Sequence, residues 1–390
     1  MKIKETFIGY ADIISPFGQG LEINFNSILS GNSAYSAISK DRYGDDYPVS
    51  IAGFLPQSLF ENNDNEYVSR SEQILDRLLK TTIVNSSMKT KIDAAFFLYK
   101  NVNSYEFYLN SKKRNSFFDM CDQDSVFKIF KKNNIIISPD NIHIIDNTCT
   151  TGLTLLTHAS QGISAGLWNN CLVCAIDLID PLSMFLLNSL GALSPSNEDP
   201  AKALRPFDVN RNGFVKTESG SIAVISGNAE NLDNTAFMKL ISFNQSNDAF
   251  RITDGREDAK YLKFSMEKAF DESHLKIDDL AFIKTQGIGT KLNDQFEAKA
   301  IKEILKESKV PVTSLKGHLG HTADASGLLE GLIAGYALKK GIILPVKNCF
   351  DLEFNLNIVK DYPIKTNLNY FLTNSSGFGG NNASAVFGII

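Results

Sequence analysis

The amino-acid sequence predicts an α/β protein whose core is duplicated. Along most of its length, strand-like apolar runs alternate with segments in which apolar residues recur at helical spacing. Such alternation is typical of a sheet covered by helices. The same order of elements starts again after a polar stretch at residues 228–235. We therefore expect two similar halves, residues 1–230 and 231–390.

The first half begins with an apolar strand in residues 3–14, which a turn at Pro16–Gly18 ends. A helix is expected to open at Ser69, because Glu72 follows three residues later in the pattern of a capping box. The strand expected at residues 171–179 is apolar apart from Asp177, as in a sheet covered on both faces. The remaining elements expected here are strands at 94–99, 142–145 and 221–225 and helices at 124–132 and 151–167.

The second half repeats the alternation of strands and helices. Its longest apolar stretch, residues 327–344, is interrupted by Glu330, Lys339 and Lys340, so it predicts a buried helix and not a membrane span. The elements expected here are strands near 237–243, 280–284, 311–315, 367–374 and 383–390 and helices near 256–271, 294–307 and 325–338.

The composition indicates a globular protein. Of the 390 residues, 43% are hydrophobic and 21% are charged, and the net charge of −5 gives no sign of a nucleic-acid partner. Five cysteines, an odd number without framework spacing, favour a reducing compartment. The first ten residues lack the apolar core of a signal peptide. We expect a cytoplasmic protein.

Cys149 lies where a strand turns into a helix. Apolar residues 142–145 precede it, and apolar residues recur at helical spacing after Gly152. The unpaired N–H groups of a helix N-terminus favour a thiolate, which is a good nucleophile for acyl groups. A free cysteine is also often a small buried hydrophobic residue, and the local pattern leaves both interpretations open.

Three other patterns do not predict the sites that they resemble. Cys171 and Cys174 lie three residues apart on a strand, so they point to opposite faces and belong to the core. The serine-hydrolase pattern at Gly162–Gly166 falls at the end of a helix and not at a strand-to-helix turn. Only eight residues follow the glycine-rich segment 377–382, so it cannot open a nucleotide-binding unit. It can supply a backbone N–H close to a ligand.

Two polar segments of the second half carry candidate acid–base or hydrogen-bonding groups. Segment 313–321 contains Lys316 and His321, but no third ligand at a suitable spacing predicts a zinc site. Gln286 offers an amide at a glycine-rich turn between a strand and a helix. Asp294 can cap that helix, and Glu297 lies one turn further on.

Taken together, five blocks resemble the β-ketoacyl-ACP synthases, the elongating condensing enzymes of the thiolase superfamily. The blocks occur in the order and at the spacing of the family, and the resemblance runs from about residue 3 to residue 388. They are C-T-T-G at 149–152, R-P-F-D-x-x-R-x-G-F-V at 205–215, x-G-x-G-T-x-x-x-D-x-x-E at 286–297, S-x-K-G-x-x-G-H at 314–321 and G-F-G-G-x-N-A at 377–383. The resemblance implies a thiolase-like fold, a duplicated core in αβαβα layers.

The resemblance also implies a mechanism and a set of site residues. Cys149 would take an acyl chain from an acyl carrier protein, and His321, with Lys316 as its partner, would promote decarboxylation of a malonyl unit. The N–H groups of Cys149 and Phe378 would form an oxyanion hole, and the Phe378 ring would gate the acyl pocket. Glu297 matches the acid of the family near the lysine. Gly379 and Thr290, from two of these blocks, complete the set expected to contact substrate.

No bound cofactor is expected, because the substrates are carried on the phosphopantetheine of the carrier protein. The resemblance further implies a dimer, either a homodimer or a heterodimer with a second ketosynthase-like chain. The helix after Cys149 and the 171–179 strand would lie near its interface. The helix opened by Ser69 resembles the docking helix of the family, so Arg70, Arg77 and Lys80 are candidate contacts for an acidic carrier protein.

The sequence departs from the family in two places. The glycine-rich turn usual after the strand at 94–99 is replaced by residues 100–103, so a different pocket floor or dimer contact is expected. The other departure lies in the site. The first active-site histidine of the family is Gln286 here, and a glutamine cannot act as a general base or a cation, although it can donate a hydrogen bond to an enolate. The main hypothesis is a condensing enzyme of a specialised fatty-acid or polyketide pathway. The alternatives are a weakly active or inactive partner subunit resembling a chain-length factor, and an acyltransferase on the same fold.

Overall fold

The computed structural model describes residues 5–39, 42, 47–60, 70–84, 91–99, 123–195 and 198–390. Its centre is a sheet of eleven strands in which two sets of five follow the same topology. The first set, in the order β1-β8-β7-β5-β6, consists of β1 (Thr6–Ser15), β5 (Ala94–Tyr99), β6 (Ile142–Ile144), β7 (Asn170–Asp177) and β8 (Ser219–Ser226). The second set, in the order β9-β15-β14-β10-β11, consists of β9 (Met238–Asn247), β10 (Leu280–Lys284), β11 (Val312–Thr313), β14 (Tyr370–Gly377) and β15 (Asn381–Ile389).

The strand directions repeat as well. In each set the first strand is antiparallel to the fifth and the fifth is antiparallel to the fourth. The fourth strand is parallel to the second, and the second is parallel to the third. The two sets join where Thr6–Ile8 of β1 pairs with 238–240 of β9. The duplicated α/β core expected from the sequence is therefore confirmed.

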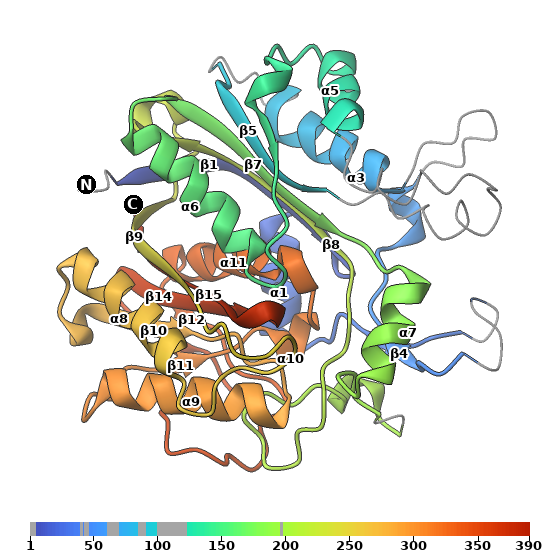
Figure 1. Cartoon of the computed structure of the whole chain (residues 1–390), viewed down its shortest axis with the longest axis vertical. Helices are drawn as coiled ribbons and strands as arrows, with labels where there is room; N and C mark the ends of the chain where they lie inside the picture. The colour runs from blue at the N-terminus through green and yellow to red at the C-terminus, as the bar shows by residue number, and fades with distance from the viewer. Residues whose placement is uncertain are drawn as a thin grey trace.

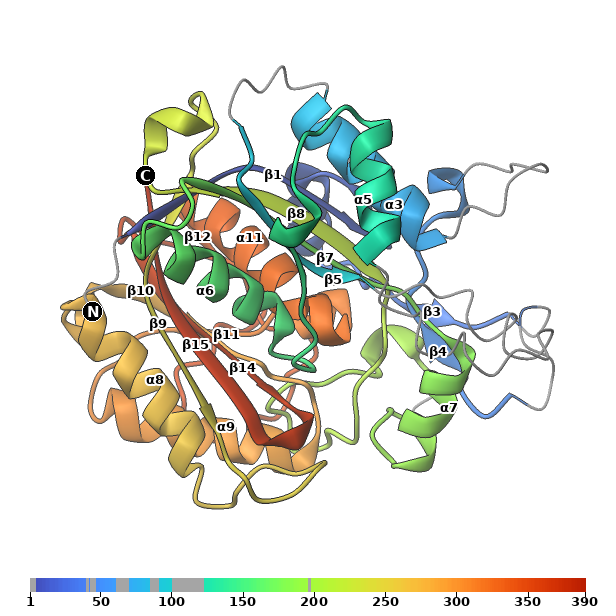
Figure 2. The same ribbon diagram turned by 45° about the horizontal axis from the view of Figure 1, so that its top comes forward.

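Helices form three layers around the two sets of strands (Figures 1 and 2). α3 (Arg70–Leu79) and α5 (Gln123–Lys132) cover the outer face of the first set, and α8 (Lys260–Ser273) and α9 (Lys291–Leu305) cover that of the second. α6 (Thr151–Ser164) and α11 (Ser326–Lys339) lie between the sets. Because this middle layer has a sheet on both sides, α11 is apolar nearly all round.

The two middle helices touch at their N-terminal ends. A Cβ on Gly152 of α6 would collide with the backbone N of Leu328, and a Cβ on Gly327 of α11 would lie 2.8 Å from the backbone N of Leu153. Only glycine permits this approach, which brings the chain after Cys149 against the chain after His321.

The remaining elements are short. They are β2 (Gly18–Gln19), which pairs with β1; the pairs β3 (Ser36–Ala37) with β4 (Ile51–Ala52) and β12 (Ile342–Ile343) with β13 (Ile364–Lys365); and the helices α1 (Leu21–Leu29), α7 (Pro181–Ser189) and α10 (Lys316–Leu319). Within the described ranges, no helix is long and apolar enough to cross a membrane.

Most of the expected elements are present with shifted ends. The helix expected to open at Ser69 is α3; Ser69 itself lies outside the described residues. The helix expected at 256–271 begins only at Lys260, after a left-handed Ala259, and the one expected at 294–307 begins three residues earlier, at Lys291. Cys171 and Cys174 pack into clusters on opposite faces of β7, as the strand period requires.

Candidate active site

The predicted strand–turn–helix setting of Cys149 is confirmed. β6 ends at Ile144 and α6 begins at Thr151, and the turn between them contains Thr148 in the left-handed region with φ 51°. The hydroxyl of Thr151 accepts a hydrogen bond of 2.7 Å from the N–H of Asn147 and donates one of 2.7 Å to the carbonyl of Thr148. These bonds fix the backbone on both sides of the cysteine.

The glycine-rich segment after β14 lies directly against this turn. The hydroxyl of Thr148 donates a 3.0 Å hydrogen bond to the carbonyl of Phe378. A Cβ on Gly377 would overlap the Thr148 hydroxyl and lie 3.0 Å from the Cys149 nitrogen. Gly379 has φ 80°, which favours glycine, and its N–H donates to the carbonyl of Ile252 at 2.6 Å. The structure therefore places Gly377 and Phe378 against the turn of Cys149, with Gly379 next in the chain.

Burial opposes the thiolate that a helix N-terminus would favour at Cys149. Although part of the residue is exposed, burial is the largest influence on its thiol and raises its pKa to about 12. The carboxylates of Asp324 and Asp177 also raise this pKa, while the ammonium groups of Lys216 and Lys316 lower it. Burial thus favours the neutral thiol of Cys149, which has buried cations and anions around it.

His321 lies beside the same cations. Its ring is 2% exposed and meets the ring of Phe214 edge to face at 4.9 Å. Burial lowers its pKa well below 6.5, and the charges of Lys316, Lys216 and Lys284 lower it further, so the imidazole is neutral. Its Nδ1 is buried and has no hydrogen-bond partner among the described residues. A buried ring nitrogen without a partner in a native site calls for a ligand.

Gln286 is fully buried, and its side chain is held at both ends. Its Oε1 accepts a 3.1 Å hydrogen bond from Ser375 and lies 3.5 Å from the Lys316 ammonium. Its Nε2 donates to the carbonyl of Ser376 at 3.0 Å. Because lysine has only donors, the amide oxygen must face Lys316, and the two amide hydrogens point away from it.

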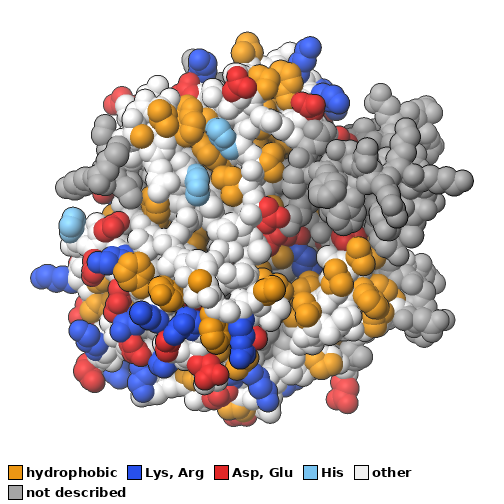
Figure 3. All heavy atoms as spheres, viewed as in Figure 1, with side chains coloured by type: hydrophobic (Ala, Val, Ile, Leu, Met, Phe, Trp, Pro, Cys, Tyr) orange, Lys and Arg blue, Asp and Glu red, His pale blue; other side chains and the backbone are white. Residues whose placement is uncertain are grey.

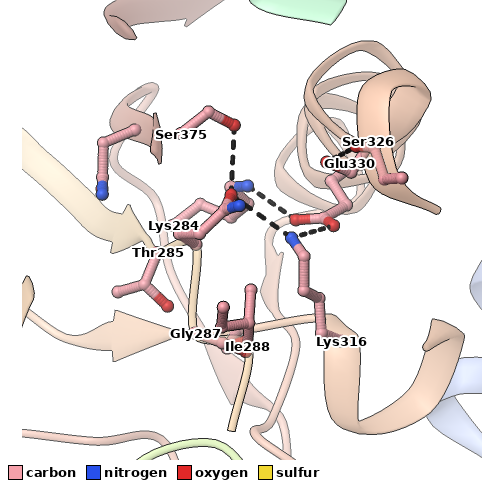
Figure 4. A network of polar contacts seen from close by, with 12 residues as sticks. Lys284, Thr285, Gly287, Ile288, Lys316, Ser326, Glu330 and Ser375 are labelled. Atoms are coloured by element: carbon pink, nitrogen blue, oxygen red, sulfur yellow. Dashed lines mark hydrogen bonds and ion pairs between the residues drawn. The ribbon is translucent and has the colours of Figure 1, made fainter. Parts of the chain in front are cut away.

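Lys316 has a different acidic partner from the one expected. Its ammonium lies 2.5 Å from Glu330 of α11, and the other oxygen of Glu330 lies 2.7 Å from the Lys284 ammonium. Figure 4 shows both lysines reaching this carboxylate. The ion pair of Lys316 is therefore with Glu330, whereas Glu297, the acid expected near the lysine, acts on Lys316 through its charge.

Glu297 instead holds the turn that contains Gln286. Its carboxylate accepts the N–H of Gln286 at 2.6 Å, the N–H of Gly287 at 2.7 Å and the Asn374 amide at 2.5 Å. Asp294 holds the next part of the turn, where it accepts the N–H groups of Ile288 and Gly289. It does not cap α9 with its side chain. The two acids are one helical turn apart, so together their carboxylates accept hydrogen bonds from four successive backbone N–H groups.

Thr290 has a structural role in the described contacts. It is the N-cap residue of α9 and makes no side-chain capping bond, and its carbonyl accepts a 3.2 Å hydrogen bond from the Arg211 guanidinium. Its expected contact with substrate stays a prediction. The described residues contain no group of three or more His, Cys, Asp or Glu side chains that could hold a metal ion.

A second buried ion pair adjoins the nucleophile. The Lys216 ammonium contacts Asp177, and both side chains are buried. The other oxygen of Asp177 accepts the Asp324 N–H at 3.1 Å. Two backbone hydrogen bonds join the chain on either side of Lys216 to His321. The N–H of His321 donates to the carbonyl of Val215, and the N–H of Thr217 donates to the carbonyl of His321.

The sequence reasoning missed Glu330 and Lys284. One available signal was a single carboxylate inside the otherwise apolar helix after His321, since an acid in such a position needs a buried partner. The other was a lysine at the end of the apolar strand that leads to Gln286.

The candidate docking residues on α3 are less available than expected. The guanidinium of Arg70 binds both oxygens of the buried Glu218, at 2.7 and 2.8 Å, and lies over the ring of Phe60. Lys80 pairs with Asp76 at 2.8 Å. Arg77 makes a weak 3.4 Å contact with Gln19. Because its charge is balanced by a buried carboxylate, Arg70 is a structural residue.

Comparisons with known proteins agree with this geometry. Residues 141–231 match the family described as "Beta-ketoacyl synthase, N-terminal domain", and residues 237–350 match "Beta-ketoacyl synthase, C-terminal domain". The chain is 31% identical over 257 residues to the tetracenomycin polyketide synthase ketoacyl synthase alpha subunit of Streptomyces glaucescens, an alignment that covers 63% of this chain and 59% of that protein. It is 32% identical over 251 residues to 3-oxoacyl-[acyl-carrier-protein] synthase 2 of Vibrio harveyi, covering 62% and 60%. The chain thus spans about three fifths of the length of these curated relatives.

Solved structures share the fold over the whole chain. A chain of the complex of a type II PKS acyl-carrier protein with its ketosynthase bound to the hexaketide superposes with a TM-score of 0.83 at 21% identity and 100% coverage of both chains. The ishigamide ketosynthase/chain length factor gives a TM-score of 0.85 at 19% identity, again covering 100% of both chains. With the duplicated layers and the two matched domains, which together span more than half of the sequence, these findings show that the chain belongs to the β-ketoacyl synthase family.

Proposed function

We propose that this chain catalyses decarboxylative Claisen condensation of an acyl group on Cys149 with a malonyl unit carried by an acyl carrier protein. The pathway would be one of specialised fatty-acid or polyketide synthesis. The observation that carries the proposal is the meeting of the Cys149 turn with the Gly377–Gly380 segment, close to a neutral His321 whose Nδ1 lacks a partner. We further propose that residues 1–230 and 231–390 are the two thiolase-like halves, which the repeated strand topology supports.

In the loading step, the Cys149 thiol attacks the thioester carbonyl of the acyl carrier. The carbon–sulfur bond to phosphopantetheine breaks, and the thiol proton goes to the departing thiolate. The N–H groups of Cys149 and Phe378 are proposed to bind the oxyanion, which the close approach of Gly377 to the Cys149 nitrogen supports. The phosphopantetheine arrives with each substrate, so the protein needs no cofactor of its own for this step.

In the condensing step, the malonyl carbon–carbon bond breaks and carbon dioxide leaves. The resulting enolate carbon attacks the acyl carbonyl on Cys149, and the released Cys149 thiolate takes up a proton. We propose that the Gln286 amide and a His321 N–H donate hydrogen bonds to the enolate oxygen. A neutral histidine and an amide are both competent donors, and neither has to change charge.

The test of this proposal uses the purified chain alone with acyl- and malonyl-carrier proteins. Formation of a β-ketoacyl carrier and of an acyl-enzyme that Cys149→Ala abolishes is the expected result. An acyl-enzyme that persists in Cys149→Ala would overturn the assignment of the nucleophile.

A second candidate is a partner subunit resembling a chain-length factor, and Gln286 at the position of the family histidine favours it. Activity that appears only after a second synthase is added would support this role. Acyl transfer without carbon dioxide release in the same assay would support an acyltransferase.

For the carrier protein, we propose a docking surface beside the site entrance. Segment 248–257 is joined to Gly379 and Gly380 by hydrogen bonds. It carries Arg251, whose side chain is 62% exposed and lies 3.8 Å from Asp254, and Arg256, which pairs with Asp258 at 2.8 Å. Both guanidinium groups lie near the ring of Phe250. Figure 3 shows further Lys and Arg side chains over the neighbouring α8 and α9. Arg77 and Lys80 remain candidates.

The charge-reversal variant Arg251→Glu should slow acyl loading most at low salt, where electrostatic steering is strongest. Equal loading rates of the variant and the wild type at low salt would exclude this surface as the docking site.

For the dimer, we propose the edge of β6 as the interface. Among the described residues, β7 lies between β5 and β8, whereas β6 has a partner strand on one side only. A groove of about 600 Å³ beside β6 and α6 is lined by residues that include His143, His158 and Trp168. Size-exclusion chromatography with light scattering, alone and with a second ketosynthase-like chain, distinguishes a homodimer from a heterodimer.

A further inference from the structure

The ammonium groups of Lys284 and Lys316 share the carboxylate of Glu330 (Figure 4). Lys284 and Lys316 are fully buried and Glu330 is 1% exposed, and each lysine lies within 2.7 Å of a different oxygen of that glutamate. When all three groups are ionised they carry one net positive charge, and the buried Glu297 is a second carboxylate whose charge acts on these lysines. Buried charges have to be balanced, and an anionic substrate would contribute to the balance of this cluster.

The cluster is connected to the site through Gln286. Lys284 precedes Gln286 by two residues at the end of β10, so both side chains point to the middle layer that contains Glu330. Glu330 holds Lys316, and Lys316 faces the Gln286 oxygen at 3.5 Å. The amide hydrogens are thereby directed away from the cluster. Lys284 thus acts on the Gln286 amide through Glu330 and Lys316.

We propose that Lys284 is a positioning residue for the condensing step: it fixes Glu330 and Lys316 behind Gln286 and supplies a positive charge that attracts a carboxylate-bearing thioester. This inference rests on the proposed function. The charge serves the reaction twice, because the malonyl carboxylate is an anion on entry and the enolate oxygen is an anion after carbon dioxide leaves. Loading of Cys149 by a neutral acyl thioester does not need this charge.

The ionisable groups that face the lysine pair come from several elements. They are Glu330 of α11, Glu297 of α9, and His321 and Cys149 of the site. Burial lowers the pKa of Lys316, the charge of Lys284 lowers it further, and Glu330 opposes both. Removing Lys284 should therefore raise the pKa of Lys316. In the pH profile of decarboxylation, the alkaline limb is where one of the two lysines loses a proton. Without Lys284, this limb should move to higher pH.

The experiment compares wild type with Lys284→Met and Lys284→Arg. Lys239→Met is the matched control, because Lys239 also forms a 2.8 Å ion pair, with Glu5, but lies outside the cluster. Lys284→Met should lower malonyl decarboxylation roughly tenfold to a hundredfold, the range for residues that orient a direct ligand. It should leave acyl loading, measured by intact mass, near the wild-type rate. Lys284→Arg should restore part of the loss, and Lys239→Met should change neither step.

Three results would overturn the role of Lys284: equal loss in both steps, no loss of decarboxylation, or an unmoved alkaline limb. Lys284→Gln, a polar neutral replacement, serves if the methionine variant does not fold. A binding measurement separates this inference from the proposed function. In a Cys149→Ala background, Lys284→Gln should weaken the affinity for a malonyl carrier but not for an acetyl carrier. A wild type that binds but does not condense contradicts the proposed function alone, and equal affinities with and without Lys284 contradict the inference alone.

Discussion

Replacing Gln286 tests whether an amide does the work of a histidine in this site. In Gln286→Ala the donor to the enolate is lost. A donor aimed at developing charge contributes about 2.7–4 kcal/mol, so condensation should fall roughly a hundredfold to a thousandfold. Loading of Cys149 should stay nearly intact, because it depends on the thiol and on the backbone N–H groups beside Gly377.

The structure separates this effect from a general loss of folding. The Ala variant also removes the hydrogen bonds to Ser375 and Ser376, which together contribute about 2 kcal/mol to stability at about 1 kcal/mol each. The turn itself should persist, since Glu297 still accepts the backbone N–H groups of residues 286 and 287. A lower Tm is therefore expected, without collapse of the site.

Gln286→Glu is the matched control. A glutamate has the same size and can still accept from Lys316 and Ser375, but an ionised carboxylate cannot donate to an enolate. It should lose condensation as Gln286→Ala does. Gln286→His, which restores the family pattern, should keep or raise decarboxylation. Loading is read by intact mass and decarboxylation by carbon dioxide release on the same preparation. A parallel loss of both steps in Gln286→Ala would refute the enolate role and leave Gln286 as a packing residue.

Three further outcomes are expected. Gly377→Ala should block loading, because its methyl group would overlap the Thr148 hydroxyl and crowd the Cys149 nitrogen, and normal acyl-enzyme formation would contradict this reading of the turn. Arg70→Ala should destabilise the fold by an amount toward the lower end of about 3–5 kcal/mol, because it leaves the buried Glu218 unpaired; Lys80→Ala is the exposed control, and equal denaturation midpoints would argue for a surface role of Arg70. Because the pKa of His321 is lowered in the folded state, the unfolded state binds more protons below pH 6.5; the free energy of unfolding should therefore fall as the pH drops below about 6.5, and less steeply in His321→Gln.

Much of the fold could be predicted because local signals and the overall plan agree. The buried strand 171–179, the turn at Cys149 and the glycines that punctuate 286–289 and 377–380 each specify backbone geometry within a few residues. The candidate site residues were predicted from five short sequence blocks that occur in a fixed order. These signals are local, and they remain readable in a single sequence.

The ionic partners could not be predicted in this way. Glu297 lies at the helical spacing of a capping acid, so the sequence allowed its carboxylate to contact Lys316. In the structure, this carboxylate accepts hydrogen bonds from two backbone N–H groups and a side-chain amide instead. Glu330 reaches Lys316 only because α11 passes behind the 286 turn. The same holds for Arg70, whose partner Glu218 lies 148 residues away in sequence. The choice between a thiolate and a neutral thiol at Cys149 could not be made from the local pattern, because burial, which raises the pKa of Cys149, depends on the whole fold.

The contact between Gly152 and Gly327 sets a practical limit on engineering this chain. The two backbones meet with room for hydrogen atoms only, so a methyl group at either position would push α6 and α11 apart. The turn of Cys149 precedes the first helix and His321 precedes the second, so that displacement would separate the two groups that are proposed to act on one substrate. Mutant libraries that seek new acyl chains should therefore hold both glycines constant, and the two halves have to be exchanged between relatives as a matched pair.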